Sequence, residues 1–425
     1  MNNISQRDSA VIWHPYTQMQ LAPGAIGIVK GEGVFLIDEA SNRYIDAIAS
    51  WWVNLHGHSH PYIAQYLSKQ LLTLEHCIFA GFTHEPAVAL AERLLPLLPG
   101  NMARIFYSDN GSTAVEVALK MAWQYHDNRQ AGRRRLIALE GAYHGDTFGA
   151  MSVSGRSLFT RPFDALLFDV SFIPFPHPGR EEDTLQALET LLQQEDAAAL
   201  IIEPLVQGAA GMRMYAPAVL EQMIRLCHTY GCLAIADEVM TGFGRTGTWF
   251  ACDQAPGVAP DIVCLSKGLT GGTVPLGVTA CTQEIYEAFL SDDHRHTLYH
   301  GHSFTANPIA CAAGLASLDL LLAPACRKQI DAIAGAHRAV AKRWQDRGAL
   351  RDIRQCGTIL ALELDTGAAG GYLDQRRDFM YHFFLERKIL LRPLGNVLYL
   401  LPPYCITPEQ LEQVYEAIDG LFAVL

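Results

Sequence analysis

Short apolar runs alternate with longer amphipathic segments through the middle of the chain. The apolar runs have the length of buried strands and cover residues 103–109, 135–141, 197–206, 232–238 and 262–267. Apolar positions recur with helical spacing over residues 111–126, 217–231 and 307–322. Runs of Leu, Ile, Val and Ala flanked by glycines are typical of parallel strands covered on both faces. The pattern therefore predicts an α/β fold, with a mostly parallel doubly wound sheet in a large domain over residues 51–322.

The two ends of the chain have a different pattern. Residues 1–50 contain two short apolar runs around a turn at residues 39–42, which predicts a hairpin. Residues 323–425 mix helical periodicity with short strand-like runs, the helices at 328–348 and 375–388 and the strands at 358–364 and 397–403. We expect the two ends to form one smaller α+β domain beside the large one.

Composition and charge narrow the class of partner. The chain has 425 residues, half of them hydrophobic, and can bury a large core. Its 44 acidic and 32 basic side chains give a net charge of −12, which argues against nucleic acid or an anionic membrane as the main partner. The start has no basic segment followed by an apolar stretch, and no apolar run approaches membrane-spanning length. Ten scattered cysteines without a C-x-x-C pair predict reduced thiols in a cytoplasmic protein that acts on small molecules.

Two polar residues end neighbouring strand-like runs. Asp237 follows LAIA and Lys267 follows IVCLS. Either residue alone is more typical of a solvated loop. Because the carboxyl ends of parallel strands form the ligand crevice of an open α/β sheet, we expect the two side chains on the same rim. An acid that pairs with a pyridinium nitrogen and a lysine that forms a Schiff base are what pyridoxal phosphate requires, so the pair predicts that cofactor.

A helix start offers an anion site. Gly111, Ser112 and Thr113 precede a clearly amphipathic segment, where free backbone N–H groups and the positive end of the helix dipole favour a phosphate. An ordinary N-cap, with Glu116 completing a capping box, explains the same residues equally well. The sequence leaves both interpretations open.

Two further motifs do not support a ligand. GFGRTG at 242–247 matches a dinucleotide fingerprint, but no helical periodicity follows it and acidic residues precede it. Histidines cluster at 56–60 and 296–302, but glycines and a proline interrupt them and no cysteine is near. We therefore predict no metal site and no dinucleotide site.

Five separated motifs carry a resemblance to a known family. They are DEVMTGFGRTG, SKGLTGG, EPLVQGAAGM, the glycine-led helix start at 111 and GAYHGDTFGAMS. Together, in their order along the chain, they resemble the class III pyridoxal-phosphate aminotransferases of fold type I, across essentially the whole chain. WHPYTQM, SWWVNLHG and LRPLGNVLYLLPPY resemble the subgroup that, in biotin synthesis, transfers an amino group from S-adenosylmethionine to 8-amino-7-oxononanoate.

The resemblance assigns roles position by position. It implies that Lys267 forms the Schiff base with pyridoxal 5'-phosphate, that Asp237 keeps the pyridine nitrogen protonated, and that Tyr143 lies along the ring as a third catalytic residue. Gly111 and Ser112 would bind the phosphate. Family members are homodimers with shared sites, so Ser303 would reach the phosphate of the neighbouring subunit, and His302 beside it is a further cofactor-binding candidate, although related proteins more often have Pro there. The substrate residues implied are Tyr16, Trp51, Tyr143, Gly301 and Arg392, with Asp146 and Arg245 near the pocket.

Some positions leave alternatives open. Arg392 would receive a substrate carboxylate, although a surface ion pair is its simpler role. Trp51 offers a flat apolar surface to a methylene chain, whereas Trp52 is expected to pack in the core. Met240 and Ala209 stand where many class III members have Gln and Glu, which disfavours a glutamate-dependent enzyme. The alternatives are an ω-amino acid aminotransferase, a lysine-using relative, an aminomutase, or a non-catalytic nucleotide- or metal-binding protein.

Overall fold

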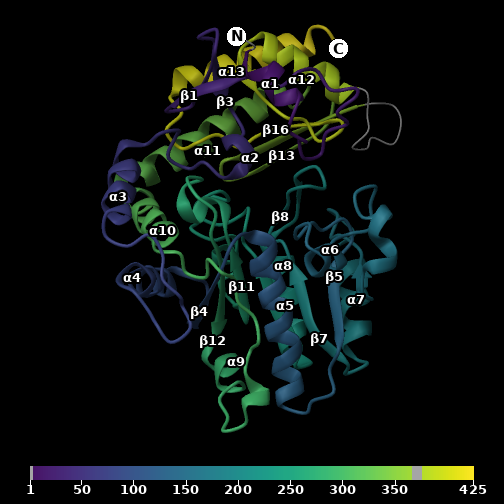
Figure 1. Ribbon diagram of the computed structural model, residues 1–425. Coiled ribbons are helices and arrows are strands. Elements are labelled where there is room, and N and C mark those ends of the chain that lie inside the picture. Colours follow the sequence, from purple (N-terminus) through teal and green to yellow (C-terminus); the bar gives the residue numbers. More distant parts are fainter. Residues whose placement is uncertain (1–2, 366–375) are drawn as a thin grey trace.

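The computed structural model describes residues 3–365 and 376–425, and Figure 1 shows two layers, a large sheet with its helices and a smaller unit above it. The large sheet has seven strands in the order β4-β12-β11-β10-β7-β5-β6. Only β12 runs antiparallel to its neighbours in this sheet, because it pairs antiparallel with both β11 and β4. The strands are β4 (Met102–Ser108), β5 (Arg135–Leu139), β6 (Ser171–Ile173), β7 (Ala197–Ile202), β10 (Leu233–Asp237), β11 (Ile262–Leu265) and β12 (Gly277–Thr282).

Alternate residues of the central strands enter two different cores. Ile137 and Leu200 pack on the side that carries α7 (Glu181–Leu192) and α8 (Pro217–Thr229). Leu136 and Ile201 pack on the other side, against α5 (Gly111–Asn128). Both faces of the sheet are thus covered by helices, which is why these strands are apolar at every position rather than at every second one. The predicted doubly wound, mostly parallel α/β sheet is confirmed.

Both ends of the chain build the smaller unit (Figure 1). Its first sheet has the order β1-β2-β3-β15, and its second has the order β13-β14-β16. β15 pairs parallel with β3, Ile389 opposite Ile45, so the C-terminal part of the chain completes a sheet that the N-terminal part begins. The strands are β1 (Ile28–Glu32), β2 (Phe35–Asp38), β3 (Arg43–Asp46), β13 (Leu350–Cys356), β14 (Ile359–Leu364), β15 (Ile389–Leu390) and β16 (Val397–Leu400). The predicted hairpin is present, since β2 and β3 pair antiparallel around residues 39–42. We keep the domain limits at residues 50 and 322 as a proposal; parts of the two outer segments, residues 1–2 and 366–375, lie outside the described residues.

Most remaining elements are helices that cover or connect these sheets. They are α1 (Ile4–Ser9), α2 (Ala49–Trp52), α3 (Pro61–Leu71), α4 (Glu85–Leu94), α6 (Phe148–Ser152), α9 (Gln283–Glu287), α10 (Pro308–Leu321), α11 (Pro324–Trp344), α12 (Arg376–Glu386) and α13 (Pro408–Phe422). A two-stranded sheet joins β8 (Val206–Gln207) to β9 (Arg213–Met214), and short 3₁₀ turns include η2 (Arg161–Leu166), η3 (Ala251–Gln254) and η4 (Lys267–Thr270). Within the part of the chain that the structure describes, no single helix meets the length and hydropathy needed to cross a membrane; α10 and α11 meet it only as a pair bent by 70°.

Candidate active site

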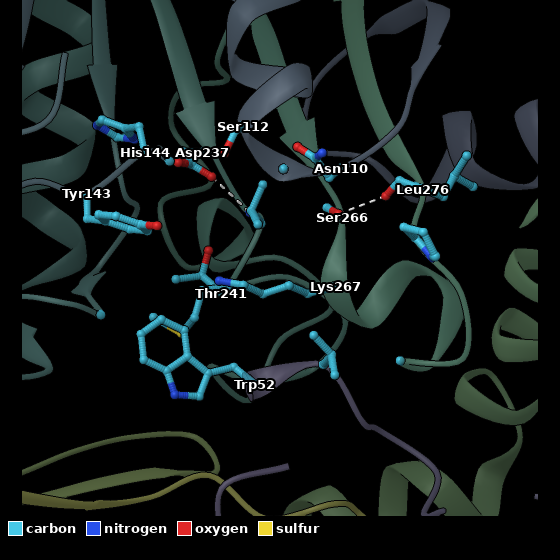
Figure 2. Close-up of a pocket in the computed structure, with 18 of the residues that line it drawn as sticks. Trp52, Asn110, Ser112, Tyr143, His144, Asp237, Thr241, Ser266, Lys267 and Leu276 are labelled. Atoms are coloured by element: carbon cyan, nitrogen blue, oxygen red, sulfur yellow. Dashed lines mark hydrogen bonds and ion pairs between the residues drawn. The ribbon is translucent and has the colours of Figure 1, made fainter. Parts of the chain in front are cut away.

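A cavity of about 430 Å³ opens where β10 and β11 end, beneath the smaller unit. Figure 2 shows Lys267 and Asp237 reaching it from different strands, with Ser112 and Asn110 on one side and Trp52 on the other. The sequence predicted Lys267, Asp237, Gly111, Ser112 and Tyr143 as neighbours, and the structure brings all of them to the lining of this one cavity.

Lys267 begins the 3₁₀ turn that follows β11. Its backbone has a φ of +46°, a left-handed conformation that costs a non-glycine residue on the order of 1 kcal/mol and directs the side chain into the cavity. Burial lowers the pKa of the amine to about 8, although the charges of Asp237 and Glu203 oppose that shift. The Nζ atom lies 4.6 Å from the centroid of the Trp52 ring, a cation–π distance. A substantial fraction of the amine is therefore neutral, and nucleophilic, near neutral pH.

Asp237 is the last residue of β10 and is 5% exposed. One carboxylate oxygen, Oδ2, lies 2.7 Å from Nδ1 of His144, and the other accepts the backbone N–H of Val239 at 3.1 Å. The acidic partner favours a proton on Nδ1 of His144. His144 therefore fixes the orientation of the Asp237 carboxylate.

Three residues of the cavity lining were not assigned to the site from the sequence. Trp52 is buried and donates from its indole to the Tyr399 hydroxyl at 2.9 Å, as core packing predicts, yet it also faces Lys267. His144 follows Tyr143 directly in the motif GAYHGDTFGAMS, and that position was the available signal. Glu203 lies within the strand-like run AAALIIEPLV, where an acid next to a proline in an apolar run was the signal.

Glu203 ties together two loops of the site. Its two carboxylate oxygens accept the backbone N–H of Tyr143 at 2.9 Å and of Gly208 at 3.1 Å. Burial raises the pKa of this acid to about 7, while the nearby His144 opposes the shift. The side chain fixes the backbone that carries Tyr143 and adds a charge that titrates near neutrality.

The start of α5 forms the anion-binding end of the cavity. The N-cap is Asn110, whose side chain accepts the N–H of Thr113, and Thr113 completes the capping box. The capping box with Glu116, one of the two interpretations left open, is wrong, because Glu116 instead accepts the N–H groups of Gly149 at 2.8 Å and Ala150 at 3.1 Å. Glu116 was not free for the cap, since a distant loop supplies donors that the local pattern could not reveal.

Close backbone approach makes this end of the cavity dependent on glycine. Gly145 has a φ of +132°, and a Cβ added there would lie 2.1 Å from Oγ of Ser112. A larger residue would push the start of α5 away from the loop that carries Tyr143. The free N–H groups of the first turn, the helix dipole and Ser112 are therefore held in a fixed cradle suited to a phosphate.

Tyr16, Trp51 and Arg392 form a wall at the mouth of the cavity, called the substrate wall below. The Tyr16 hydroxyl lies 3.2 Å from that of Tyr143, and both tyrosines bond to Oδ2 of Asp146. Tyr16 packs against Trp51 with ring centroids 5.6 Å apart, and the Arg392 guanidinium carbon lies 4.6 Å from the Trp51 centroid. No salt bridge joins Arg392 to an acid among residues 3–365 and 376–425, so the structure does not support the surface ion pair considered for this residue.

The segment of Gly301, His302 and Ser303 lies elsewhere in the single chain. Nδ1 of His302 is 3.3 Å from Oδ2 of Asp109, and its Nε2 is 2.9 Å from Nε2 of His300. A Cβ at Gly301 would meet nothing within 4 Å. None of the three residues lines the cavity that holds Lys267, so within one chain they are not brought to the other predicted site residues.

The motifs rejected from the sequence have structural contacts. Arg245, in GFGRTG, is buried and donates to the carbonyl oxygens of Pro402 at 2.8 Å and Asn54 at 3.0 Å, which ties this loop to the smaller unit. Turns and the short η3 follow the motif rather than an α-helix. His58 pairs with Asp46 at 3.0 Å and His56 with Ser317 at 3.1 Å. Within the described ranges, no three His, Cys, Asp or Glu side chains are grouped to hold a metal ion.

The geometry and the sequence define the class of protein. The sequence matches the model of class III aminotransferases over residues 17–422, and the chain belongs to this family. Two curated relatives are both called adenosylmethionine-8-amino-7-oxononanoate aminotransferase. The relative from Synechococcus elongatus is 50% identical over 418 residues, 96% of this chain and 98% of the relative. The one from Geobacter sulfurreducens is 41% identical over 443 residues, 97% of this chain and 95% of the relative.

Solved structures agree with this class. An enzyme of the same name from Methanocaldococcus jannaschii is 35% identical and superposes with a TM-score of 0.93 over 98% of each chain. An amine transaminase from an uncultivated Pseudomonas species, in its PLP-bound form, is 30% identical with a TM-score of 0.89 over 97% of this chain and 98% of the other. The predicted fold type I architecture and aminotransferase class are confirmed, and the alternative of a non-catalytic binding protein is excluded.

Proposed function

We propose that this protein transfers an amino group from S-adenosylmethionine to 8-amino-7-oxononanoate, giving 7,8-diaminononanoate for biotin synthesis, with pyridoxal 5'-phosphate as cofactor. One observation carries the proposal: near-full-length identity of 50% to a relative bearing that enzyme's name, in a chain with a buried lysine opposite an aspartate. The wall of Tyr16, Trp51 and Arg392 supports the choice of substrates, because it offers an apolar face and a cation to a long-chain acid.

The residues of the cavity fit the proposed cofactor. Lys267, a buried amine with a lowered pKa, can bind the aldehyde of the cofactor. The carboxylate of Asp237 can pair with its protonated ring nitrogen. The first turn of α5, where Gly145 leaves room for Ser112, can bind the phosphate of the cofactor. The chemical donors are thus present, and no polar group in the set conflicts with them.

The site residues then divide the chemistry among them. Bound pyridoxal phosphate supplies an electron-withdrawing ring that stabilises negative charge at the substrate carbon being deprotonated. Asp237, oriented by His144, would keep the ring nitrogen of the cofactor protonated. Lys267, whose pKa is lowered by burial, would take the proton from that carbon and return it, as general base and then general acid. Burial raises the pKa of Tyr143 far above its ordinary value, so its hydroxyl remains a hydrogen-bond donor.

The substrate wall favours a long-chain acid. Arg392 presents a planar cation over Trp51, in position for a carboxylate that approaches the mouth of the cavity. The indole and the Tyr16 ring give the methylene chain apolar surface. This arrangement favours an acid with its amino and keto groups several carbons from its carboxylate.

We also propose a cytoplasmic homodimer with shared sites. Gly301, His302 and Ser303 do not line the cavity of their own chain, and a Cβ at Gly301 would meet nothing within 4 Å. In a homodimer with shared sites, Ser303 and His302 would approach the neighbouring cofactor phosphate and Gly301 the neighbouring substrate. All ten cysteines are free thiols, which suits a reducing compartment.

Absorbance tests the proposal directly. Purified protein loaded with pyridoxal phosphate should be yellow, and borohydride reduction followed by peptide mass spectrometry should find the cofactor on Lys267. Adding S-adenosylmethionine alone should bleach the visible band, whereas lysine alone should not. The variant Lys267→Ala is the matched control and should give no reducible adduct. Bleaching by lysine but not by S-adenosylmethionine would reject the proposed donor.

A further inference from the structure

A second cavity, of about 380 Å³, lies beside the substrate wall. Its lining consists of Tyr16, Asp146, Phe148, Met151, Phe159 and Phe163. Tyr16 and Asp146 belong to both the wall and this cavity, so the two spaces meet at the hydroxyl group of Tyr143. A substrate that reaches the first cavity past Tyr143 can therefore extend into either the Arg392 side or this second space.

We propose that the second cavity binds the adenosine part of the amino donor, while the Arg392 side takes the carboxylate of the acceptor. This inference rests on the proposed function and deepens it. It explains how one site accepts two molecules of different shape: the two arms of the pocket select by aromatic character and by charge.

The aromatic character of the cavity favours a flat ring. Tyr16 and Phe159 stand edge to face with centroids 5.6 Å apart, and Phe148 and Phe163 do the same at 6.2 Å. Phe148 is 52% and Phe163 40% exposed, although both face a concave space. Aromatic side chains with open faces bind nucleobases by stacking, and a buried methionine such as Met151 adds a polarisable floor. A flat purine can therefore stack on these rings, whereas a flexible methylene chain cannot.

The charges of the two arms are opposite. Asp146 places a carboxylate at the junction with the second cavity, held by the hydroxyls of Tyr16 and Tyr143. A sulfonium cation is attracted to that carboxylate, whereas the carboxylate of an oxononanoate is repelled by it. On the Trp51 side, the Arg392 guanidinium attracts a carboxylate and repels a cation. The sulfonium charge thus favours the aromatic cavity for the adenosyl part of the donor, and Arg392 favours the carboxylate of the acceptor on the other side.

Phe159→Ala and Phe163→Ala test the aromatic contacts in the cofactor-loaded enzyme. Three measurements are compared: binding of adenosine by calorimetry, bleaching by S-adenosylmethionine, and the reaction of the amino form of the enzyme with 8-amino-7-oxononanoate. We expect adenosine affinity and the donor half-reaction to fall about tenfold, and the acceptor half-reaction to keep its kcat/KM. Phe168→Ala is the matched control, because Phe168 is 43% exposed close to η2 but does not line the cavity.

Asp146→Asn separates charge from stacking. It should weaken binding of cationic S-adenosylmethionine while neutral adenosine binds as before. Wild-type enzyme that fails to bind adenosine overturns the inference, whichever donor it uses. A fall in the acceptor half-reaction alone, in either phenylalanine variant, also overturns it and assigns the cavity to the acceptor chain. Failure of the wild-type protein to bleach with S-adenosylmethionine, in contrast, rejects the donor of the proposed function and is read out separately from adenosine binding.

Discussion

The pKa of Lys267 gives a prediction that can be worked from the structure. Burial brings it from 10.5 to about 8. At pH 7.5 a group with that pKa is neutral in about a quarter of molecules, compared with about one in a thousand for an unshifted lysine. Because the charge of Glu203 opposes the shift, Glu203→Gln should lower the pKa of Lys267 further. The amine of the variant is then more often neutral at pH 7.5.

Trace acetylation of cofactor-free protein measures this pKa. A small amount of acetic anhydride is added between pH 6 and pH 11, since only the neutral amine reacts, and peptide mass spectrometry reports each lysine separately. Reactivity of Lys267 should reach half its maximum near pH 8, and at a lower pH in Glu203→Gln. The exposed Lys69 in the same digest is the internal reference. A midpoint near 10 for Lys267, or a rise in Glu203→Gln, would refute the reasoning.

The same shift makes stability depend on pH. Between the folded pKa of about 8 and the unfolded value near 10.5, the unfolded chain binds more protons at this site than the folded chain. The free energy of unfolding contributed by Lys267 therefore rises with pH across this window, by about 3 kcal/mol in total, and is constant below it. Lys267→Met should remove this rise in urea unfolding of the cofactor-free protein, and an unchanged rise would contradict the assignment.

Three further substitutions have expected outcomes. Arg392→Ala should lower kcat/KM for the oxononanoate by about 2 to 5 kcal/mol in transition-state binding, and unchanged steady-state kinetics would show that the carboxylate is held elsewhere. Asp237→Asn leaves His144 with a weaker acceptor and should slow the donor half-reaction by about 3 kcal/mol or more in stopped-flow absorbance; a normal rate would exclude the carboxylate's role. Gly145→Ala puts a Cβ against Ser112 at a φ of +132°, costing about 1 to 3 kcal/mol, and should weaken pyridoxal phosphate binding in fluorescence titration. Gly335→Ala, whose added Cβ meets nothing within 4 Å, should bind the cofactor normally.

The sequence predicted what depends on periodicity and on strand ends. Alternating apolar runs fixed the order of the central elements, and Asp237 and Lys267 came together because β10 and β11 are parallel neighbours. The N-cap of α5 was misassigned because Glu116 is recruited by Gly149, a contact set by the tertiary fold. The double role of Trp52 had the same origin, since only the packing of α2 against β16 brings its ring to both Tyr399 and Lys267.

The segment 301–303 marks the limit of what one chain can explain. The resemblance assigns it to a phosphate and a substrate, while its contacts in the single chain are to Asp109 and His300. The local sequence of a loop does not predict where the loop lies in a dimer, because contacts between the surfaces of two chains determine that position.

The pairing of β3 with β15 has a consequence for biogenesis. A ribosome delivers Ile45 long before its partner Ile389, so the nascent chain carries an unfinished sheet edge through most of translation. Trp51 follows that sheet edge in the chain, and it can contact Arg392 only after the C-terminal part of the chain has been synthesised. Premature termination before β15 should therefore leave an aggregation-prone product, and the substrate wall cannot form until residue 392 has been synthesised.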